Sequence, residues 1–468
     1  MGTLSPLPPG PRAPAVVNPA RLMTRPIESL LGWHRRYGDV VTVPLLIFGT
    51  GVYVADVDAI REMFTGDQSD LHAGEANAPL AAVLGERSLL VLDGPEHLRQ
   101  RRLLLPPLKG SAVHESRAVI REVAEAEAAR WRVGERFAVR ERTRALTFEV
   151  IARIVFGVTE AARIERLHRV LTAVLDATVL LALPELLRRD LGRWSPWGRL
   201  RRLLERADAL IYEEIAQRRR QSDRAERGDV LSLLLQTRDE DGRPMTDREL
   251  RDELMTMLLA GHETTATSLA FTFDLLLHTP TVLARLTDEP DDGAYVGAVV
   301  TESLRLRPVI DAAERTAPRT IAGHALPAGI RVYPNIVAMH YREDLYPEAA
   351  AFRPDRFLDG RAGTCAWLPF GGGIRRCIGA PLAEAEIAEV TRVVLSRVRL
   401  RAVQPAPDRV VMRGITLVPR HGVEVEVVAQ AARAAGTPAA RARSAGMSRS
   451  THSPEAAVSP ATMPVAPP

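Results

Sequence analysis

The chain has 468 residues, of which 46% are hydrophobic and 26% are charged, and its formal net charge is only +4 at pH 7. This composition is typical of a globular protein with a sizeable core, and it excludes a disordered or collagen-like chain. The pI of about 9.4 does not indicate a nucleic-acid partner, because acidic residues are interspersed with the basic ones. The two cysteines, Cys365 and Cys377, show no CxxC spacing, which argues against a disulfide framework or a conventional zinc site.

Residues 1–20 are proline-rich and predict an extended arm that becomes ordered only if it packs on the body of the protein. The N-terminus lacks a basic stretch followed by an apolar one. No uncharged apolar run is long enough to span a bilayer. We therefore expect a cytoplasmic protein without membrane insertion.

From residue 21 onward the pattern is mainly helical, with a few short β-like runs. Apolar residues at spacings of three and four predict helices over 114–131, 141–156, 198–220 and 381–400. Strands are expected over 40–48, 52–55, 330–333 and 422–428. These elements predict a mainly α protein with small β-sheets, and we expect one domain over 21–429 because no linker divides it.

The composition changes after Val428. Residues 430–468 are rich in Ala, Pro, Ser and Arg and nearly free of large apolar side chains. Such a segment cannot bury enough surface to offset the entropy lost on ordering. We expect it to be a disordered tail.

A long helix is predicted from Thr246 to about His278. The sequence "TDRE" offers a capping box, with Thr246 as N-cap and Glu249 at the third helical position. The middle of this helix reads "AGHETTATS", which is unusually polar for a buried helix. A kinked helix with satisfied polar groups explains the stretch as well as a functional site does.

Two further motifs follow. In "ESLR", Glu302 and Arg305 lie three apart on a predicted helix, which alone indicates an ordinary surface pair. The segment "FRPDRF" at 352–357 comes next, and thirteen residues later the loop "FGGGIRRCIGA" begins at Phe370. Glycines, arginines and a following helix N-terminus around Cys377 favour a thiolate, so this sulfur is expected to have more than a packing role.

Taken together, these motifs resemble the cytochrome P450 family of haem-thiolate monooxygenases over about residues 21–428. "AGHETT" is similar to the oxygen-activating segment of the family's long central helix, "ESLR" to its Glu-x-x-Arg helix, and "FRPDRF" to its meander segment. "FGGGIRRCIG" fits the haem-loop pattern Phe-x-x-Gly-x-Arg-x-Cys-x-Gly throughout. The resemblance implies the P450 fold, in which the long helix lies over the haem and the cysteine loop beneath it.

The resemblance implies haem b as the cofactor, with Cys377 as the thiolate ligand of the iron and Phe370 packed near the sulfur. Positions expected to bind the haem propionates are basic: His97, Arg101, Arg315 (with Arg319 as the alternative) and Arg375. From the residues alone, "DGPEHLRQRR" at 93–102 fits a solvated basic face better. The resemblance further implies that Glu302, Arg305 and Arg356 form a buried structural charge cluster.

Glu263 and Thr264 match the acid and alcohol pair that delivers protons during oxygen activation in the family. This pair favours an oxygen-reducing monooxygenase over a peroxide-driven peroxygenase. A haem-binding sensor without turnover remains an alternative. So does a cysteine hydrolase, although no histidine lies in a recognisable motif with Cys377.

The sequence holds neither a dinucleotide-binding glycine motif nor a cysteine cluster, so electrons must come from separate proteins. We expect a ferredoxin and a ferredoxin reductase as electron donors to a monomeric enzyme. Candidates for a positive docking patch are basic: Arg99, Arg102, Lys109 and Arg376. An ordinary solvated surface is the alternative.

The family sets substrate specificity with segments that are mostly apolar here, which favours a hydrophobic small molecule as substrate. The segments include 66–88, 309–313 and 415–416. Asp311 is the polar exception, and we hypothesise that it accepts a hydrogen bond from a substrate hydroxyl or amine.

Overall fold

The computed structural model describes residues 7–14, 16–45, 49–65, 71–182, 188–192, 194–290, 292–311, 315–317, 320–327, 329–360, 363 and 365–430. These residues lie in one compact unit. The expected tail, 430–468, lies outside the described residues except for Gln430. The N-terminal arm packs on the body, because the Pro9 carbonyl accepts a hydrogen bond from the Thr42 N–H at 3.0 Å.

Helices make up most of the described chain. Those of two turns or more are α1 (Val17–Thr24), α2 (Pro26–Tyr37), α3 (Val57–Thr65), α6 (Gly94–Leu104), α7 (Ser111–Ala128), α8 (Val139–Phe156), α9 (Ala161–Ala177), α10 (Pro196–Arg220), α12 (Asp247–Leu277), α13 (Pro280–Asp288), α14 (Gly293–Leu306) and α16 (Ala380–Arg397). Shorter α-helices are α4 (Ala73–Ala76), α5 (Ala81–Leu84), α11 (Val230–Gln236) and α15 (Ile336–His340). The 3-10 turns include η6 (Pro354–Phe357) and η7 (Gly373–Arg375).

The strands form small, separate sheets. They are β1 (Val40–Leu45), β2 (Gly49–Val54), β3 (Arg136–Ala138), β4 (Arg315–Ala317), β5 (Thr320–Ile321), β6 (His324–Ala325), β7 (Ile330–Pro334), β8 (Val398–Ala402), β9 (Val410–Arg413), β10 (Thr416–Pro419) and β11 (Glu424–Gln430). The largest sheet has the order β1-β2-β7-β4, with β2 and β7 parallel. A second sheet has the order β3-β11-β8, and β9–β10 and β5–β6 form pairs.

The prediction of a mainly α protein with small sheets is confirmed, and all four predicted helices exist, as α7, α8, α10 and α16. The last of them was predicted too long, because α16 ends at Arg397 and β8 begins at Val398. In β8 the side chains of Val398 and Leu400 are buried while those of Arg399 and Arg401 are not. This alternation is the period of a strand and not that of a helix.

The predicted capping box of α12 is present. The Glu249 N–H donates to the Thr246 hydroxyl at 3.2 Å, and the Thr246 N–H donates to the Glu249 carboxylate at 2.7 Å. The helix then runs without a break through its polar middle. A Cβ on Gly261 would lie 3.0 Å from Ile151 of α8, so glycine here allows two helices to approach closely.

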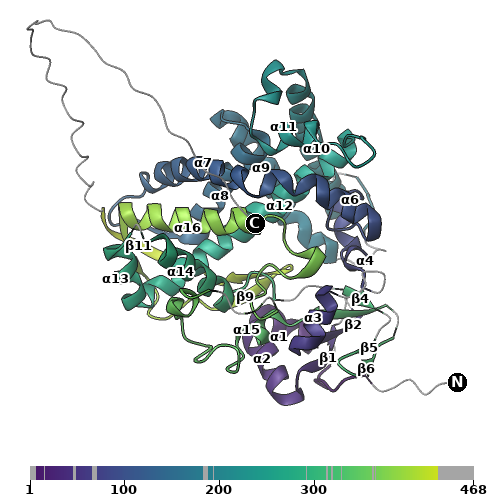
Figure 1. Ribbon diagram of the computed structural model, residues 1–468, viewed down its shortest axis with the longest axis vertical. Coiled ribbons are helices and arrows are strands. Elements are labelled where there is room, and N and C mark those ends of the chain that lie inside the picture. The colour runs from purple at the N-terminus through teal and green to yellow at the C-terminus, as the bar shows by residue number, and fades with distance from the viewer. Residues whose placement is uncertain are drawn as a thin grey trace, which may run out of the picture. The chain divides into compact units, whose positions relative to one another are not determined.

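Helix α12 lies at the centre of the helical part of the molecule. It packs against α8, α10, α14 and α16, and most of its side chains are buried. Figure 1 shows α7, α8, α12 and α16 gathered together, whereas α1–α3 gather with β1 and β2. The helical region therefore supplies the main hydrophobic core, and the β1 sheet packs with smaller clusters of its own.

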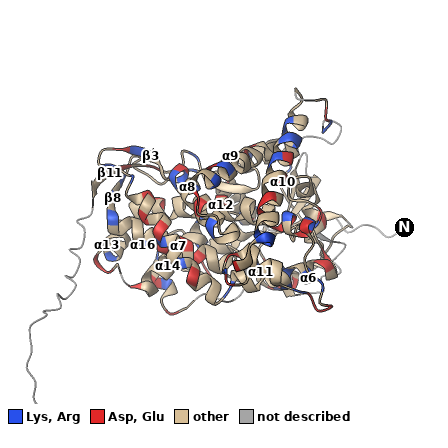
Figure 2. Ribbon diagram, turned by 90° about the horizontal axis from the view of Figure 1, so that it is seen from above, with Lys and Arg blue, Asp and Glu red and all other residues tan. Residues whose placement is uncertain are grey.

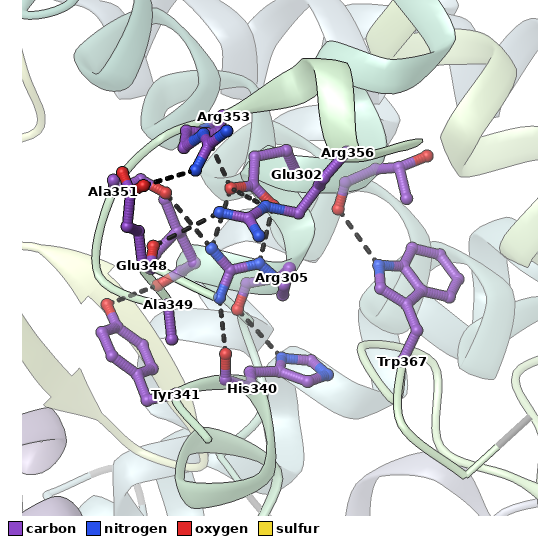
Figure 3. Close-up of polar contacts among 12 residues, drawn as sticks. Glu302, Arg305, His340, Tyr341, Glu348, Ala349, Ala351, Arg353, Arg356 and Trp367 are labelled. Carbon is purple, nitrogen blue, oxygen red and sulfur yellow. Dashed lines mark hydrogen bonds and ion pairs between the residues drawn. The ribbon is translucent and has the colours of Figure 1, made fainter. Parts of the chain in front are cut away.

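Glu302 and Arg305 of α14 are fully buried, with side chains 0% exposed, so their interpretation as a surface pair is wrong and the buried charge cluster is confirmed. Arg305 donates to both Glu302 carboxylate oxygens at 2.6 and 2.8 Å, and Arg356 donates to one at 3.2 Å. Figure 3 shows the two guanidiniums converging on this carboxylate. A buried carboxylate is tolerated here because each oxygen receives charged donors.

We predict that Glu302→Gln destabilises the protein by about 3–5 kcal/mol, because two buried guanidiniums lose their compensating charge. Urea unfolding would measure this change. The control is Glu240→Gln, since Glu240 is 80% exposed and pairs with an exposed Arg102. That control should change stability by less than about 0.5 kcal/mol, and an equally small change in Glu302→Gln would contradict a structural role for the cluster.

Candidate functional site

The loop that carries Cys377 is closed by backbone hydrogen bonds. The Cys377 N–H donates to the Phe370 carbonyl at 3.0 Å, and the Arg376 N–H donates to the Gly373 carbonyl at 3.1 Å. Helix α16 follows at Ala380. The N–H groups of Gly379 and Ala380 are directed at the Cys377 sulfur.

The glycines of the loop are required by its approach to α3. A Cβ on Gly373 would lie 1.9 Å from the Phe64 carbonyl oxygen, and one on Gly372 would lie 2.5 Å from the Phe64 ring. Gly371 and Gly373 also have φ values of 65° and 60°, which L-residues with side chains rarely adopt. The loop therefore reaches its position only with glycine at these places.

Cys377 lies deep in the molecule, yet its side chain keeps accessible surface, so it faces an internal space and not the packed core. Burial raises the pKa of its thiol, while the N–H groups of Gly379 and Ala380 and the charges of Arg376 and Arg101 oppose that rise. The sulfur is thus surrounded by groups that favour a thiolate once a cation binds it.

Arg375, two residues before Cys377, reaches back to the chain before α6. Its Nη1 donates to the Leu89 carbonyl at 3.2 Å, and its Nη2 donates to the Leu92 carbonyl and to the Asp93 carboxylate. Burial lowers the pKa of Arg375, and the nearby Asp93 partly restores it. The guanidinium is therefore held by the protein at one side of the loop.

His97 and Arg101 lie one turn apart on α6. His97 is buried, and Arg101 is half-buried close enough to Cys377 for their charges to interact. Burial lowers the pKa of Arg101, and no group among the described residues accepts a hydrogen bond from its guanidinium. A solvated basic face does not fit these two side chains.

The polar middle of α12 divides between two directions. Ala260 and Thr264 keep accessible surface in a helix that is otherwise buried, and the Thr264 hydroxyl donates to the Ala260 carbonyl at 2.6 Å. Glu263 instead reaches toward α8, where it forms ion pairs with Arg140 and, at 2.7 Å, with Arg144. Burial and the like charge of Arg144 lower the pKa of Arg140 to about 10.

The remaining predicted positions are less well determined. Arg315 lies in β4, but its side chain falls outside the described residues, as does the whole of Arg319. Asp311 is buried, with 7% of its surface exposed, and its backbone carbonyl accepts a hydrogen bond from the Ile336 N–H at 3.0 Å. Its contact with a substrate stays a hypothesis.

The candidate docking patch is largely neutralised. Arg99 pairs with Asp239 and Glu249, both at 2.7 Å, and Arg102 pairs with Glu240. Figure 2 shows acidic segments beside the basic ones around α6. Arg376 and Lys109 are the two candidates without such a partner among the described residues.

The described part of the chain has neither a membrane-spanning helix nor a cluster of metal-binding side chains. No helix there is both long enough and apolar enough to cross a bilayer. No group of three or more His, Cys, Asp and Glu side chains there is arranged to hold a metal ion.

Comparison with known proteins identifies the family. The model of the family "Cytochrome P450" matches residues 7–422. "Putative cytochrome P450 135B1" of Mycobacterium tuberculosis is 41% identical over 93% of this chain and 96% of its own length. "Putative cytochrome P450 137" of the same species is 40% identical over 85% of each chain.

Solved structures agree on the fold. The cytochrome P450DA heme domain has a TM-score of 0.79 at 24% identity and covers 91% of this chain and 98% of its own. A cyanobacterial CYP120A1 with bound retinoic acid has a TM-score of 0.76 at 22% identity and covers 90% and 99%. The chain belongs to the cytochrome P450 family. Like the members of that family, it is a haem-binding protein.

The residues present fit haem. Ala260 of α12 and Cys377 of the cysteine loop both keep accessible surface. The sulfur offers a ligand to the iron, and Arg101 offers a half-buried cation that has no acceptor within the described part of the chain. A haem carboxylate bound to Arg101 would remove the cost of leaving that guanidinium unpaired.

Several contacts could not be inferred from the sequence. Arg140 and Arg144 lie more than a hundred residues before Glu263, and nothing in "VRERTR" marks them as its partners. The same holds for His340, which is buried behind the cysteine loop. Its Nδ1–H donates to the Arg305 carbonyl at 2.9 Å, and its Nε2 accepts from the Leu368 N–H at 2.8 Å.

Because both ring nitrogens are used in this way, His340 is neutral in the folded protein. Burial, and secondarily the charge of Arg305, lowers its pKa from 6.5 to about 3. Between these values the unfolded chain binds a proton at this position that the folded protein does not. The stabilisation is complete above about pH 6.5 and is lost as the pH falls toward 3.

We predict that lowering the pH from 6 to 5 reduces the free energy of unfolding of His340→Gln less than it reduces that of the wild type. The difference should approach about 1.4 kcal/mol per pH unit, the value for one proton. Urea unfolding at several pH values would measure the slope. His114→Gln, on the exposed face of α7, is the control and should keep the wild-type slope. An unchanged slope in His340→Gln would show that the buried imidazole is not held neutral.

Proposed function

We propose that this P450 is a haem-thiolate monooxygenase that inserts one oxygen atom of O2 into a hydrophobic organic substrate. The overall reaction is RH + O2 + two electrons + two protons, which gives ROH and water. The observation that supports it most is the setting of Cys377, whose sulfur faces an internal space and receives two backbone N–H groups. Haem ligated by a thiolate supplies the oxidising chemistry, because the electron-rich sulfur favours O–O cleavage.

In this proposal the chain binds haem b through three kinds of contact. Cys377 ligates the iron, and the Phe370 segment closes the loop beneath it. Arg101 and Arg375 donate to the haem carboxylates, with His97 and Arg315 as further donors. Arg375 retains N–H groups for this purpose, because only three of its five take part in the contacts it makes with the described residues.

On the other side of the space, α12 provides the groups that handle protons. The Thr264 hydroxyl donates its hydrogen to the Ala260 carbonyl, so its oxygen is left to accept a hydrogen bond from a water molecule. Glu263 is the acid that relays protons from solvent to this water. Its partner Arg144 also lies 3.8 Å from Asp176, which is 70% exposed, so the ion-pair network extends to the surface.

Electrons come from separate proteins, and we propose a ferredoxin and a ferredoxin reductase acting on a monomeric, cytoplasmic enzyme. Since Arg99 and Arg102 are paired, Arg376 and Lys109 provide the remaining positive charge for an acidic ferredoxin. The substrate is hydrophobic, as retinoic acid is in the related CYP120A1 structure. Asp311 would give such a molecule one polar anchor.

Exchanging Cys377 for histidine should abolish the red-shifted Soret band that thiolate-ligated ferrous haem shows with carbon monoxide, because no other sulfur would bind the iron. Cys365→Ser is the matched control and should keep the band. Loss of the band in Cys365→Ser alone would overturn the assignment of Cys377.

Thr264→Ala should keep consuming NADPH with surrogate redox partners, but product per NADPH should fall severalfold and hydrogen peroxide should rise, because the hydroxyl that holds the water is gone. Glu263→Gln should instead slow oxygen consumption. Assays of NADPH, peroxide and product would measure both effects.

The matched control is Thr272→Ala. Thr272 lies on the same helix and bonds the preceding turn in the same way, but it is fully buried. It should leave product per NADPH unchanged. Unchanged coupling in Thr264→Ala would contradict the role of that hydroxyl, and product formed only with added peroxide would favour a peroxygenase.

A further inference from the structure

Asp93 joins two parts of the chain that are far apart in sequence. One carboxylate oxygen accepts from the Gly74 N–H and the other from the Glu75 N–H, both at 2.9 Å. The first of these oxygens also forms an ion pair with Arg375 of the cysteine loop. A single carboxylate therefore connects α4 with the loop that carries Cys377.

The contact at α4 tolerates no side chain on Gly74. A Cβ there would lie 2.5 Å from the Val91 carbonyl oxygen and 2.7 Å from the second Asp93 carboxylate oxygen. Both distances are shorter than real Cβ contacts, and one neighbour is backbone that cannot swing away. Helix α4 can dock on Asp93 only because this residue is glycine.

The segment that leads to Asp93 is held from its other side by α12. The Leu89 N–H donates to Glu253 at 2.8 Å, and the Arg87 N–H donates to Asp252 at 2.9 Å. The carbonyl of the same Leu89 accepts from Arg375. The segment is thus fixed to the central helix and presents its carbonyl groups to the cysteine loop.

These contacts orient Arg375 but do not use all of its N–H groups. Its Nε–H and one N–H on Nη1 have no acceptor among the described residues. The Asp93 carboxylate forms an ion pair with this guanidinium. Asp93 therefore keeps a charged donor in place beside the space that Cys377 faces.

We propose that Asp93 is a positioning residue that orients Arg375 toward a haem carboxylate and couples haem binding to the docking of α4. The inference rests on the proposed contact between Arg375 and haem. Because α4 belongs to the segment 66–88 that is expected to line the substrate site, Asp93 links the substrate side of the pocket with the haem loop. Coupling of this kind is reciprocal: docking of α4 strengthens haem binding by the same factor as haem strengthens docking.

The test measures haem loss from the holoprotein to excess apomyoglobin. Asp93→Asn should lose haem about tenfold faster, the effect of removing one charged hydrogen-bond partner. Asp408→Asn is the matched control, because Asp408 is a buried carboxylate that accepts from the N–H groups of His421 at 2.8 Å and Val423 at 3.1 Å. It should lower the thermal midpoint without changing haem loss.

Gly74→Ala provides a second route to the same result. It displaces α4 from Asp93 without altering Arg375 or Asp93, so it should also speed haem loss, and it carries the test if Asp93→Asn does not fold. A wild-type or slower rate of haem loss in the folded Asp93 variant would overturn the proposal. A slower rate would mean that Asp93 competes with the haem carboxylate for Arg375.

Amide hydrogen exchange of the peptide over 71–77 is a second measurement. A loss of stability confined to the cysteine loop would not change it. Arg375→Gln should speed exchange there, although no hydrogen bond or ion pair joins Arg375 to α4 among the described residues, and it should add nothing in the Asp93→Asn background. If Arg375→Gln leaves haem loss unchanged, the proposed haem contact of Arg375 is wrong. If it speeds haem loss but Asp93→Asn does not, that contact stands and only the coupling through Asp93 is wrong.

Discussion

The position of the Cys377 sulfur is the constraint on which the rest of the structure depends. A buried thiol resists ionisation, so the protein has to place donors around it that favour the thiolate. The N–H groups of Gly379 and Ala380 do this only if the chain turns sharply before α16. The loop before this turn also requires glycine where it passes Phe64, because a Cβ on Gly373 would collide with the Phe64 carbonyl oxygen.

Two sets of contacts hold this loop in place. One contributes mainly to stability, and the other lies on the side of the proposed chemistry. On one side, α14 and α15 fix the start of the loop, because Trp367 donates to the Thr301 carbonyl at 3.1 Å and Leu368 donates to His340. These contacts adjoin the Glu302 cluster (Figure 3). On the other side, α12 presents its polar middle, and the segment ending at Asp93 joins α12 to Arg375. A substitution on the α14 and α15 side of the loop should therefore affect folding, whereas one on the α12 side should affect turnover.

The sequence predicted the elements that local chemistry determines. The capping box at Thr246 marks the start of α12, and helical spacing marks α7, α8 and α10 within a few residues. The sequence could not show where α16 ends and β8 begins, because apolar and β-branched residues fit the helical and the strand period equally over so short a run. The spacing of Glu302 and Arg305 did not show their burial either, since the same spacing is common on exposed helices, and only the resemblance to the P450 family implied it.

The candidate site was predictable in its residues but not in its partners. A motif in one loop identifies Cys377 and Arg375, yet the groups that hold Arg375 come from the chain before α6, more than 280 residues earlier. The same is true of Glu263, whose two arginine partners on α8 are set by helix packing and not by local sequence. Long-range pairing of charges is a property of the folded chain, so a single sequence does not reveal it.

The central claim is that one sulfur atom, that of Cys377, binds the haem iron. X-ray absorption at the iron edge of the haem-loaded ferric protein tests it most directly, because the spectrum identifies the atoms of the first coordination shell. The account predicts one sulfur scatterer in wild type and in Cys365→Ser, and none in a Cys377 variant. A wild-type iron with only nitrogen and oxygen neighbours would contradict it.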